Sequence, residues 1–261
     1  MNTDARPAFD WIKAPQNAQF LRRLNRFACL VKLDGRECKD HLPNSGRLEE
    51  LLIPGAPVII EKRRDQGKTL HDTLLIQTKG FHSGDPLWVV CDTPKLLRWA
   101  LDMQLVQIGP RDSEISMEPR LADGRLDLRL QPPGVDHWIE TKSVNLLDRQ
   151  GLARFPDAPT PRGLKHVQAL QQMQSAAVHG WLIFMVMRAD AIGFAPFAER
   201  DPNLTAALLH AQYSGLQILA LQFSAGPRLH FIGKLPVILP PPPFPGFWPS
   251  DSPCKQAVGH P

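Results

Sequence analysis

The sequence predicts a mixed α/β protein, α+β as a whole, in which a small five-stranded barrel precedes a mixed sheet with helices on both faces. Residues 27–79 contain short strand-like runs separated by tight turns such as Asp34-Gly35, a pattern typical of a small closed barrel. After residue 85, strand-like runs alternate with helix-like runs, which indicates a sheet covered on both faces. From Leu239 onward the chain is too rich in proline to continue a sheet.

These changes of pattern divide the chain into four segments, with the domain boundary near Gly84-Asp85-Pro86. We expect a flexible N-terminus, a barrel, a mixed-sheet domain and a disordered proline-rich tail over residues 1–17, 18–82, 83–238 and 239–261.

In the barrel we expect strands at residues 27–33, 37–42, 58–62 and 69–79, and a short helix at residues 48–52. Cations and two aromatic residues crowd its first half: Phe20, Arg22, Arg23, Arg26, Phe27, Lys32, Arg36 and Arg47. Cations that attract phosphates, together with rings on which bases stack, are typical of oligonucleotide-binding barrels. A solvated basic face over two core phenylalanines explains the same composition equally well.

In the second domain, Thr93-Pro94 is a helix start with a hydroxyl cap and proline at the first helical position. Gly180 is the expected end of a later helix that begins at Pro161. The predicted strands are at residues 87–91, 115–121, 181–188 and 216–223, and the predicted helices are at 95–105, 161–179 and 203–213.

The most informative stretch, residues 124–144, has the alternation of two strands joined by a Pro-Gly turn. Residues two apart on a strand share a face and lie about 6.6 Å apart, so Glu140 and Lys142 point the same way. A hairpin brings Asp127 against them. Two carboxylates can hold Mg²⁺, and a lysine beside the ion can position a water or neutralise developing charge. A solvated edge hairpin with an ordinary ion pair is the alternative interpretation of the same residues. The pattern resembles the PD-(D/E)xK nuclease core.

Composition and charge set the broad class of the protein. The 261 residues are 43% hydrophobic and 21% charged, an ordinary globular composition, and a net charge of +4 permits an anionic partner. Four cysteines, Cys29, Cys38, Cys91 and Cys254, form no CxxC pair and fit buried free thiols in a reducing compartment. No signal-like or membrane-spanning apolar run occurs, so we expect a cytoplasmic protein without membrane contact.

Three separated segments together resemble the sugar fermentation stimulation protein family. They are HLPNSGRLEELLIPGAPV before residue 59, EPRLADGRLDLRL with IETKSVNL between residues 118 and 147, and FPDAPTPRGLKHVQAL at residues 155–170. The third is too long to be accidental. Leu42, Leu97, Arg120 and Thr141 depart from the family pattern, but none of these replaces a metal ligand.

The resemblance implies an oligonucleotide-binding barrel followed by a PD-(D/E)xK nuclease-like domain, and it implies roles for individual residues. Asp127 and Glu140 would coordinate Mg²⁺, with Mn²⁺ as the alternative ion, and the carbonyl of Thr141 would complete the shell. Glu118 would be a further metal ligand, and Lys142 would attend the attacking water. These residues are the expected catalytic set of Asp127, Glu140 and Lys142 and the expected metal set of Asp127, Glu140 and Glu118.

Nucleic acid is expected to contact a wider set of cations. Arg162 and His166 are four residues apart at the start of a helix and share a face, where the helix dipole favours a phosphate. A charge-paired surface with Asp157 as the partner is the alternative. The expected nucleic-acid-binding residues are Arg22, Arg23, Arg26, Arg47, Arg125, Arg162, Lys165 and His166.

The expected function is therefore DNA binding with Mg²⁺-dependent phosphodiester cleavage by a bacterial nuclease. DNA is the expected partner, with RNA as the alternative, and weak sequence specificity follows because these cations address phosphates. A homodimer is left open. The competing interpretation is a non-cleaving DNA-binding regulator linked to sugar (maltose) metabolism, as the family name implies, since a fold does not settle activity. A barrel for small molecules or proteins is a third interpretation, but it does not require the carboxylate cluster.

Overall fold

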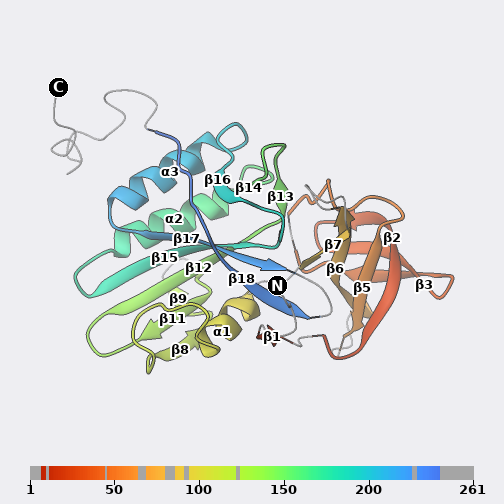
Figure 1. Cartoon of the computed structure of the whole chain (residues 1–261), viewed down its shortest axis with the longest axis horizontal. Coiled ribbons are helices and arrows are strands. Elements are labelled where there is room, and N and C mark those ends of the chain that lie inside the picture. Colours follow the sequence, from red (N-terminus) through yellow and green to blue (C-terminus); the bar gives the residue numbers. More distant parts are fainter. Residues whose placement is uncertain are drawn as a thin grey trace.

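A computed structural model describes residues 7–9, 12–44, 46–63, 69–79, 86–90, 94–121, 124–224 and 228–241. The chain forms an N-terminal barrel and a larger mixed-sheet domain that lie side by side (Figure 1). The expected boundary at Gly84-Asp85, the residues Cys91 and Thr93, and the tail from residue 242 lie outside the described residues.

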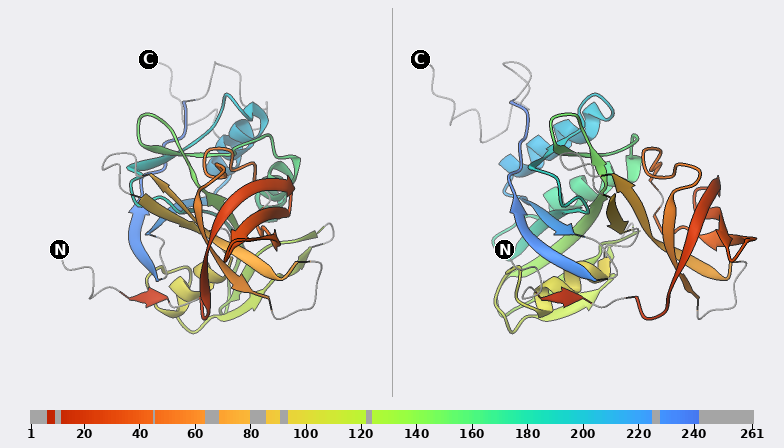
Figure 2. Two further views of the ribbon diagram at one scale, coloured as in Figure 1. Left: turned by 90° about the vertical axis from the view of Figure 1, so that its right-hand side faces the viewer. Right: turned by 45° about the vertical axis from the view of Figure 1, so that its right-hand side comes forward.

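The N-terminal domain is a closed five-stranded barrel of the oligonucleotide-binding kind. The strands run in the order β4-β3-β2-β5-β6, and a parallel pairing of His41 with Asp72 closes β4 onto β6. Figure 2, in which the barrel is turned toward the viewer, shows these strands curving round one another. The barrel strands are β2 (Pro15–Asn25), β3 (Ala28–Leu33), β4 (Arg36–His41), β5 (Pro57–Lys62) and β6 (His71–Lys79).

Three expectations for the N-terminal half were wrong. Residues 8–9 form β1 (Ala8–Phe9), which pairs with the last strand of the second domain, and β2 already begins at Pro15, so the N-terminus is not flexible throughout residues 1–17. The expected strand at residues 87–91 is β7 (Pro86–Val90), which pairs with β6 and extends the barrel sheet. Residues 49–51 form a turn rather than a helix, entered through Leu48 at a φ of 50°.

The second domain is organised around a seven-stranded sheet in the order β1-β18-β17-β15-β12-β11-β8. The central strands β12, β15 and β17 are parallel, and the outer neighbours are antiparallel. The strands not yet bounded are β8 (Glu114–Met117), β11 (Leu128–Gln131), β12 (Asp136–Val144), β15 (Val178–Val186), β17 (Gln217–Ser224) and β18 (Leu229–Leu235).

Two smaller sheets and three helices complete this domain. The small sheets pair β9 (Arg120–Leu121) with β10 (Gly124–Arg125), and β14 (Leu152–Phe155) with β13 (Leu146–Leu147) and β16 (Gly193–Pro196). The helices are α1 (Pro94–Asp102), α2 (Pro161–Met173) and α3 (Pro202–Tyr213).

Alternation along β15 shows how the central sheet separates two cores. Leu182 and Phe184 belong to the apolar cluster that includes the buried residues of α2 and α3. Ile183 and Met185 belong to the other cluster, which contains α1 and the apolar interior of the barrel. Because side chains alternate between the faces of a strand, α2 and α3 cover one face and α1 covers the other.

Two element boundaries in this domain differ from those predicted. The helix from Pro161 ends at Met173, not His179, because Val178 and His179 pair with Asp136 and His137 at the start of β15. The predicted strand at residues 115–121 is broken at Glu118, which has a φ of 50°. No helix in the described part of the chain is both long enough and apolar enough to cross a membrane.

Candidate active site

The site is centred on Glu140, which lies at the middle of the central strand β12. Glu140 and Lys142 share the strand face of Val144, whose side chain packs in the core beneath α2. His166 of α2 reaches down to this face. Its Nδ1 and the Nζ of Lys142 both donate to Oε1 of Glu140. The side chains of Glu140, His166 and Lys142 are 4%, 12% and 15% exposed, so the three groups meet in a largely buried place.

Asp127 joins this group from the other arm of the hairpin. The pairing of Leu128 with Ile139, continued by one residue, places Asp127 opposite Glu140. The backbone N–H of Thr141 donates to Oδ2 of Asp127 at 2.7 Å, and the Thr141 hydroxyl donates to the same oxygen. The predicted hairpin therefore exists, and it brings Asp127, Glu140 and Lys142 together.

The pKa values of the two carboxylates are shifted in opposite directions. Burial, followed by the negative charge of Glu140, raises the pKa of Asp127, and this is only partly offset by the hydrogen bonds from Thr141 and by Lys142. Burial also acts to raise the pKa of Glu140, but the hydrogen bond from His166 and the charge of Lys142 outweigh it, so the pKa of Glu140 is lowered. Two carboxylates that repel each other in a buried place favour a bound cation.

One atom in the cluster supports a metal at this position. Oε2 of Glu140 is buried and has no hydrogen-bond partner in the described structure, although buried polar atoms are normally satisfied. No group of three or more His, Cys, Asp or Glu side chains within the described ranges could hold a metal ion. Mg²⁺ needs only one or two carboxylates because it keeps several of its waters, so Asp127 and Glu140 fit this ion.

Glu118, the expected third ligand, is not gathered into the buried cluster. Its side chain is 70% exposed and accepts a hydrogen bond from Arg125 at 3.1 Å, and Arg125 is itself 54% exposed. The positive φ of Glu118 breaks the strand at this point. The link between Glu118 and the site is through the backbone, since its N–H donates to the carbonyl of Asp127 at 2.9 Å.

The N-terminus of α2 supplies cations beside the carboxylates. Thr160 caps the helix by accepting the N–H of Gly163 at 3.1 Å, and Pro161 follows it. A Cβ on Gly163 would lie 2.8 Å from Cγ2 of Thr160, so a larger residue there would displace the capping side chain. Arg162 and Lys165 are exposed, while His166 points to Glu140.

Asp157 does not pair with these cations, contrary to the alternative interpretation of the α2 segment. Its Oδ2 accepts the backbone N–H groups of Arg47 and Leu48, at 2.6 and 3.2 Å. A Cβ on Gly46 would lie 2.9 Å from the same oxygen. The two longest family-like motifs therefore meet at one contact between the domains.

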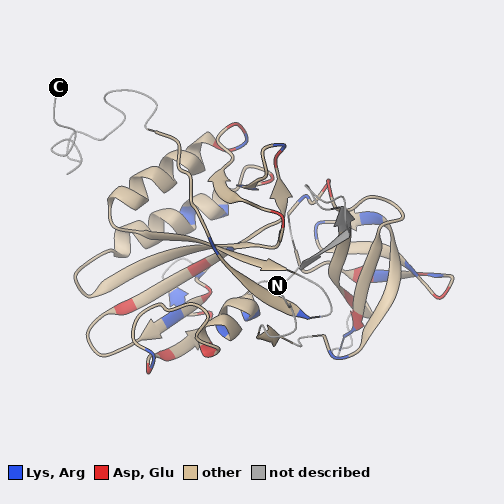
Figure 3. Ribbon diagram, in the orientation of Figure 1, with Lys and Arg blue, Asp and Glu red and all other residues tan. Residues whose placement is uncertain are grey.

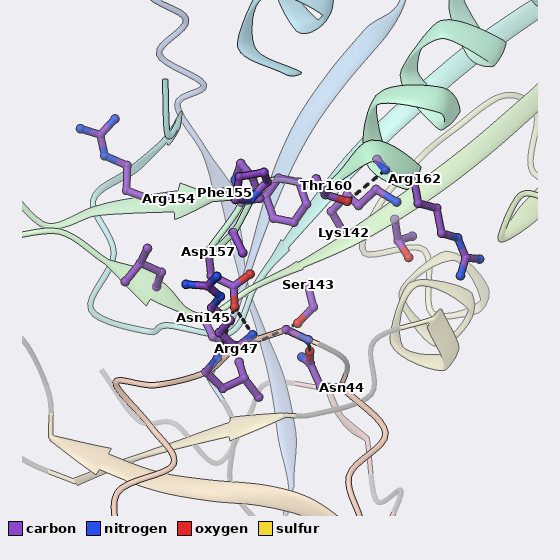
Figure 4. A pocket seen from close by; sticks show the side chains of 18 of the residues that line it. Asn44, Arg47, Lys142, Ser143, Asn145, Arg154, Phe155, Asp157, Thr160 and Arg162 are labelled. Carbon is purple, nitrogen blue, oxygen red and sulfur yellow. Dashed lines mark hydrogen bonds between the residues drawn. The ribbon is translucent and has the colours of Figure 1, made fainter. Parts of the chain in front are cut away.

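This contact borders a pocket of about 650 Å³ between the barrel and the second domain (Figure 4). The residues that line it include Asn44 and Arg47 from the barrel, and Lys142, Asn145 and Arg162 from the second domain. The close view shows Asp157 turned toward the Arg47 backbone, with Lys142 and Thr160 at the α2 end. Glu140 and Lys142 of the cluster also line this cleft, whereas Asp127 and His166 are not among its lining residues.

The barrel cations are placed unequally with respect to this pocket. Arg26 and Arg47 line it, whereas Arg22 is an exposed residue of β2 outside the lining. The guanidinium of Arg23 donates to the carbonyls of Arg26, Gly46 and Arg47, at 2.8, 2.6 and 2.6 Å, and so it holds the loop that carries Arg47. Across the two domains, Lys and Arg are interspersed with Asp and Glu (Figure 3).

Sequence reasoning did not single out Asn44, Ser143 or Asn145, which also line the pocket. Ser143 and Asn145 directly follow the Glu-x-Lys pattern, and Asn44 lies in the Pro-Asn-Ser-Gly turn. Their position within two conspicuous motifs was the available signal. Of the two phenylalanines expected for stacking, Phe20 is buried in the barrel and Phe27 is 50% exposed.

Comparison with known proteins identifies the family. The family model described as "Sugar fermentation stimulation protein RE domain" matches residues 93–228, and the model described as "SfsA N-terminal OB domain" matches residues 21–86. The chain belongs to the sugar fermentation stimulation protein family. Together these matches cover most of both domains, and they place the barrel and the carboxylate site in one family architecture.

Relatives in this family align over nearly their whole length. Sugar fermentation stimulation protein homologs from Natranaerobius thermophilus and Acetivibrio thermocellus are each 34% identical to the chain; the alignments cover 88% and 85% of the chain and 96% of either relative. A solved structure of Pyrococcus furiosus SfsA in complex with Ca²⁺ is 26% identical, with a TM-score of 0.78, covering 87% of this chain and 97% of that one.

Proposed function

We propose that the protein binds nucleic acid between its two domains and cleaves phosphodiester bonds with the aid of Mg²⁺ or Mn²⁺. The observation that carries the proposal is the buried meeting of Asp127, Glu140, Lys142 and His166, in which Oε2 of Glu140 has no hydrogen-bond partner among the described residues. An unpaired buried carboxylate oxygen is costly, and a bound cation would remove that cost at Glu140.

The charge arrangement supports a cation and a phosphate in the same place. Two carboxylates facing a phosphate would repel it unless a metal intervened. In the related Pyrococcus furiosus protein the structure was solved in complex with Ca²⁺, a hard ion that prefers oxygen ligands, as Mg²⁺ does. Asp127 and Glu140 are the residues that would hold the ion here.

A divalent cation at this position would polarise a phosphoryl oxygen and lower the pKa of a water. Side chains of the protein beside the two carboxylates can assist the same reaction. Lys142 lies against Glu140, where it can position the water or neutralise developing charge. His166 fixes the Glu140 carboxylate from α2. Arg162 and the capped N-terminus of α2 suit a neighbouring phosphate.

The proposal is tested by incubating labelled single-stranded and duplex substrates with the protein in Mg²⁺, Mn²⁺ or EDTA. We expect shortened products with either metal and none in EDTA. Intact substrates under every condition, with the protein shown to be folded, would contradict cleavage.

One observation favours a second candidate, a DNA-binding regulator that does not cut. Lys142 and His166 both hydrogen-bond to Oε1 of Glu140, and no group of three ligands occurs in the described residues. Such a protein would retain DNA affinity in EDTA, and its affinity would be the same whether or not Mg²⁺ is added. The cleavage assay and a parallel binding assay therefore separate the two functions.

A further inference from the structure

The pocket between the domains has the size of a site for one unstacked nucleotide. Its volume of about 650 Å³ lies within the range of ~300–1,000 Å³ typical of small-molecule sites. In a duplex the bases are stacked and paired inside the helix, so only a base that has left the stack can enter such a site. A double helix could present only its backbone to the rim.

The lining of the pocket contains a polar group that lacks a partner. Asn145 is 6% exposed, and its Nδ2 donates to the Ser143 hydroxyl at 3.2 Å, while its Oδ1 is buried with no hydrogen-bond partner in the described structure. An oxygen held in this way requires a donor. The exocyclic amino group of a base, or a sugar hydroxyl, has that chemistry.

Cations on two walls of the pocket match the phosphates on either side of such a nucleotide. Arg47 comes from the barrel and Arg162 from α2. Neither guanidinium makes a hydrogen bond or an ion pair within the part of the chain that the structure describes. Both are exposed, and guanidinium groups bind phosphate oxygens in pairs.

An exposed ring follows Arg26, a residue of the pocket rim, although the ring is not itself part of the lining. Phe27 is 50% exposed and lies next to Arg26, whose guanidinium stacks over the ring at 5.5 Å from its centroid. The guanidinium of Arg23 binds the carbonyls of Arg26 and Arg47, so the ring and the pocket loop are held as one unit. Flat rings at such a rim stack unpaired bases regardless of sequence.

We propose that the interdomain pocket accepts an unpaired nucleotide, so that the protein selects single-stranded nucleic acid over duplex. Asn145 accepts a hydrogen bond from the nucleotide in the pocket, Arg47 and Arg162 bind its flanking phosphates, and Phe27 stacks on a neighbouring base. The inference rests on the proposed nucleic-acid function, but it is independent of whether cleavage occurs.

The test measures fluorescence anisotropy in EDTA, so that cleavage cannot interfere, with a labelled 12-nucleotide DNA without self-complementarity and its blunt 12-base-pair duplex. We expect wild-type affinity for the single strand to exceed that for the duplex at least tenfold. Phe27→Ala should weaken single-strand binding roughly fivefold to a hundredfold, as for the loss of one base stack. Asn145→Ala should weaken it about threefold to tenfold, as for one hydrogen bond.

Matched controls are Ile53→Ala, an apolar side chain of the barrel domain that is 57% exposed, and Asn203→Ala, an exposed asparagine on α3. Neither lines the pocket, and neither should alter single-strand affinity. Melting curves verify that Asn145→Ala is folded. If Asn145→Ala does not fold, the affinity of Phe27→Ala, a change at an exposed position, tests the inference instead. Equal affinity for both probes, no binding of either, or unchanged affinity in both Phe27→Ala and Asn145→Ala would overturn the inference. Single-strand preference without cleavage in Mg²⁺ would support it and overturn only the proposed nuclease activity.

Discussion

Oδ2 of Asp157 accepts the backbone N–H of Arg47 at 2.6 Å and so joins the second domain to the barrel. The same oxygen takes the N–H of Leu48 at 3.2 Å. An ionised acceptor makes stronger hydrogen bonds than a neutral one. One carboxylate therefore fixes the barrel loop that forms a wall of the cleft, and with it the position of Arg47.

We expect Asp157→Ala to lower the free energy of unfolding by about 1–3 kcal/mol, because two backbone donors lose their acceptor. Nucleic-acid affinity should also fall, since the Arg47 loop is no longer held. Chemical denaturation and anisotropy measure the two effects. The control is Asp102→Ala, which removes a surface i,i+4 pair with Arg98 and should change stability by less than about 0.5 kcal/mol. Equal effects of the two variants would contradict this account.

Removal of either carboxylate should abolish cleavage and leave the fold intact. In Asp127→Asn and Glu140→Gln a metal ligand is lost, so product formation in Mg²⁺ should drop by at least about 10²-fold. DNA binding in EDTA should be retained or improved, because a negative charge facing the phosphates has been removed. Gel-based cleavage and anisotropy on the same preparations test this. Full activity in either variant would exclude that residue as a ligand.

Lys142→Ala should separate chemistry from metal binding. The lysine contacts Glu140 but is not a ligand, so Mg²⁺ affinity should change little. Turnover should fall by roughly 10²–10⁴ if the lysine manages a proton or charge in the transition state. Single-turnover rates at saturating Mg²⁺ measure this. The neighbouring Lys165→Ala, at an exposed position of α2, is the control, and an equal loss in both variants would point to simple phosphate attraction.

A pH-dependent contribution to stability is expected from Asp148. Burial acts to raise the pKa of this carboxyl, but the N–H groups of Leu152 and Gln150 and the Arg154 guanidinium outweigh it, and the pKa is lowered. A lowered folded-state pKa gives stability that is fully present above the ordinary aspartate value of about 4 and is lost as pH falls through the folded-state value.

Asp148→Asn should therefore lower the free energy of unfolding by about 1–2 kcal/mol at pH 7 and by much less near pH 2. Urea titrations at both pH values measure the difference. A destabilisation that is the same at pH 7 and pH 2 would show that the Asp148 charge contributes nothing.

Local pattern predicted the hairpin but did not predict its depth in the molecule. The period of two around Glu140 and Lys142 placed both side chains on one face, as found. The contact from His166 could not be derived, because it depends on how α2 packs over β12, and nothing local fixes that packing. The unpaired Oε2 of Glu140 and the position of Asn145 in the pocket also depend on tertiary packing, so only the structure reveals them.

The predicted ends of helices and strands were wrong where pairing with a distant strand overrides the local preference of the sequence. The helix-like run from Pro161 continues past Met173, yet the chain turns because Val178 must pair with Asp136 at the edge of β12. In β2, proline and the consecutive Arg22 and Arg23 hide the alternation, and the strand is recognised only by its pairing with β3 and β5. Secondary-structure propensity is a weak guide wherever pairing within a sheet provides most of the stabilisation of a segment.

The most direct test of the metal-dependent account is a calorimetric titration of Mg²⁺ into the protein and into Glu140→Gln and Lys142→Ala. We predict saturable binding in the wild type, loss of that binding in Glu140→Gln, and nearly unchanged binding in Lys142→Ala. Absence of Mg²⁺ binding in the wild type, or identical binding in all three proteins, would contradict a metal site at Asp127 and Glu140.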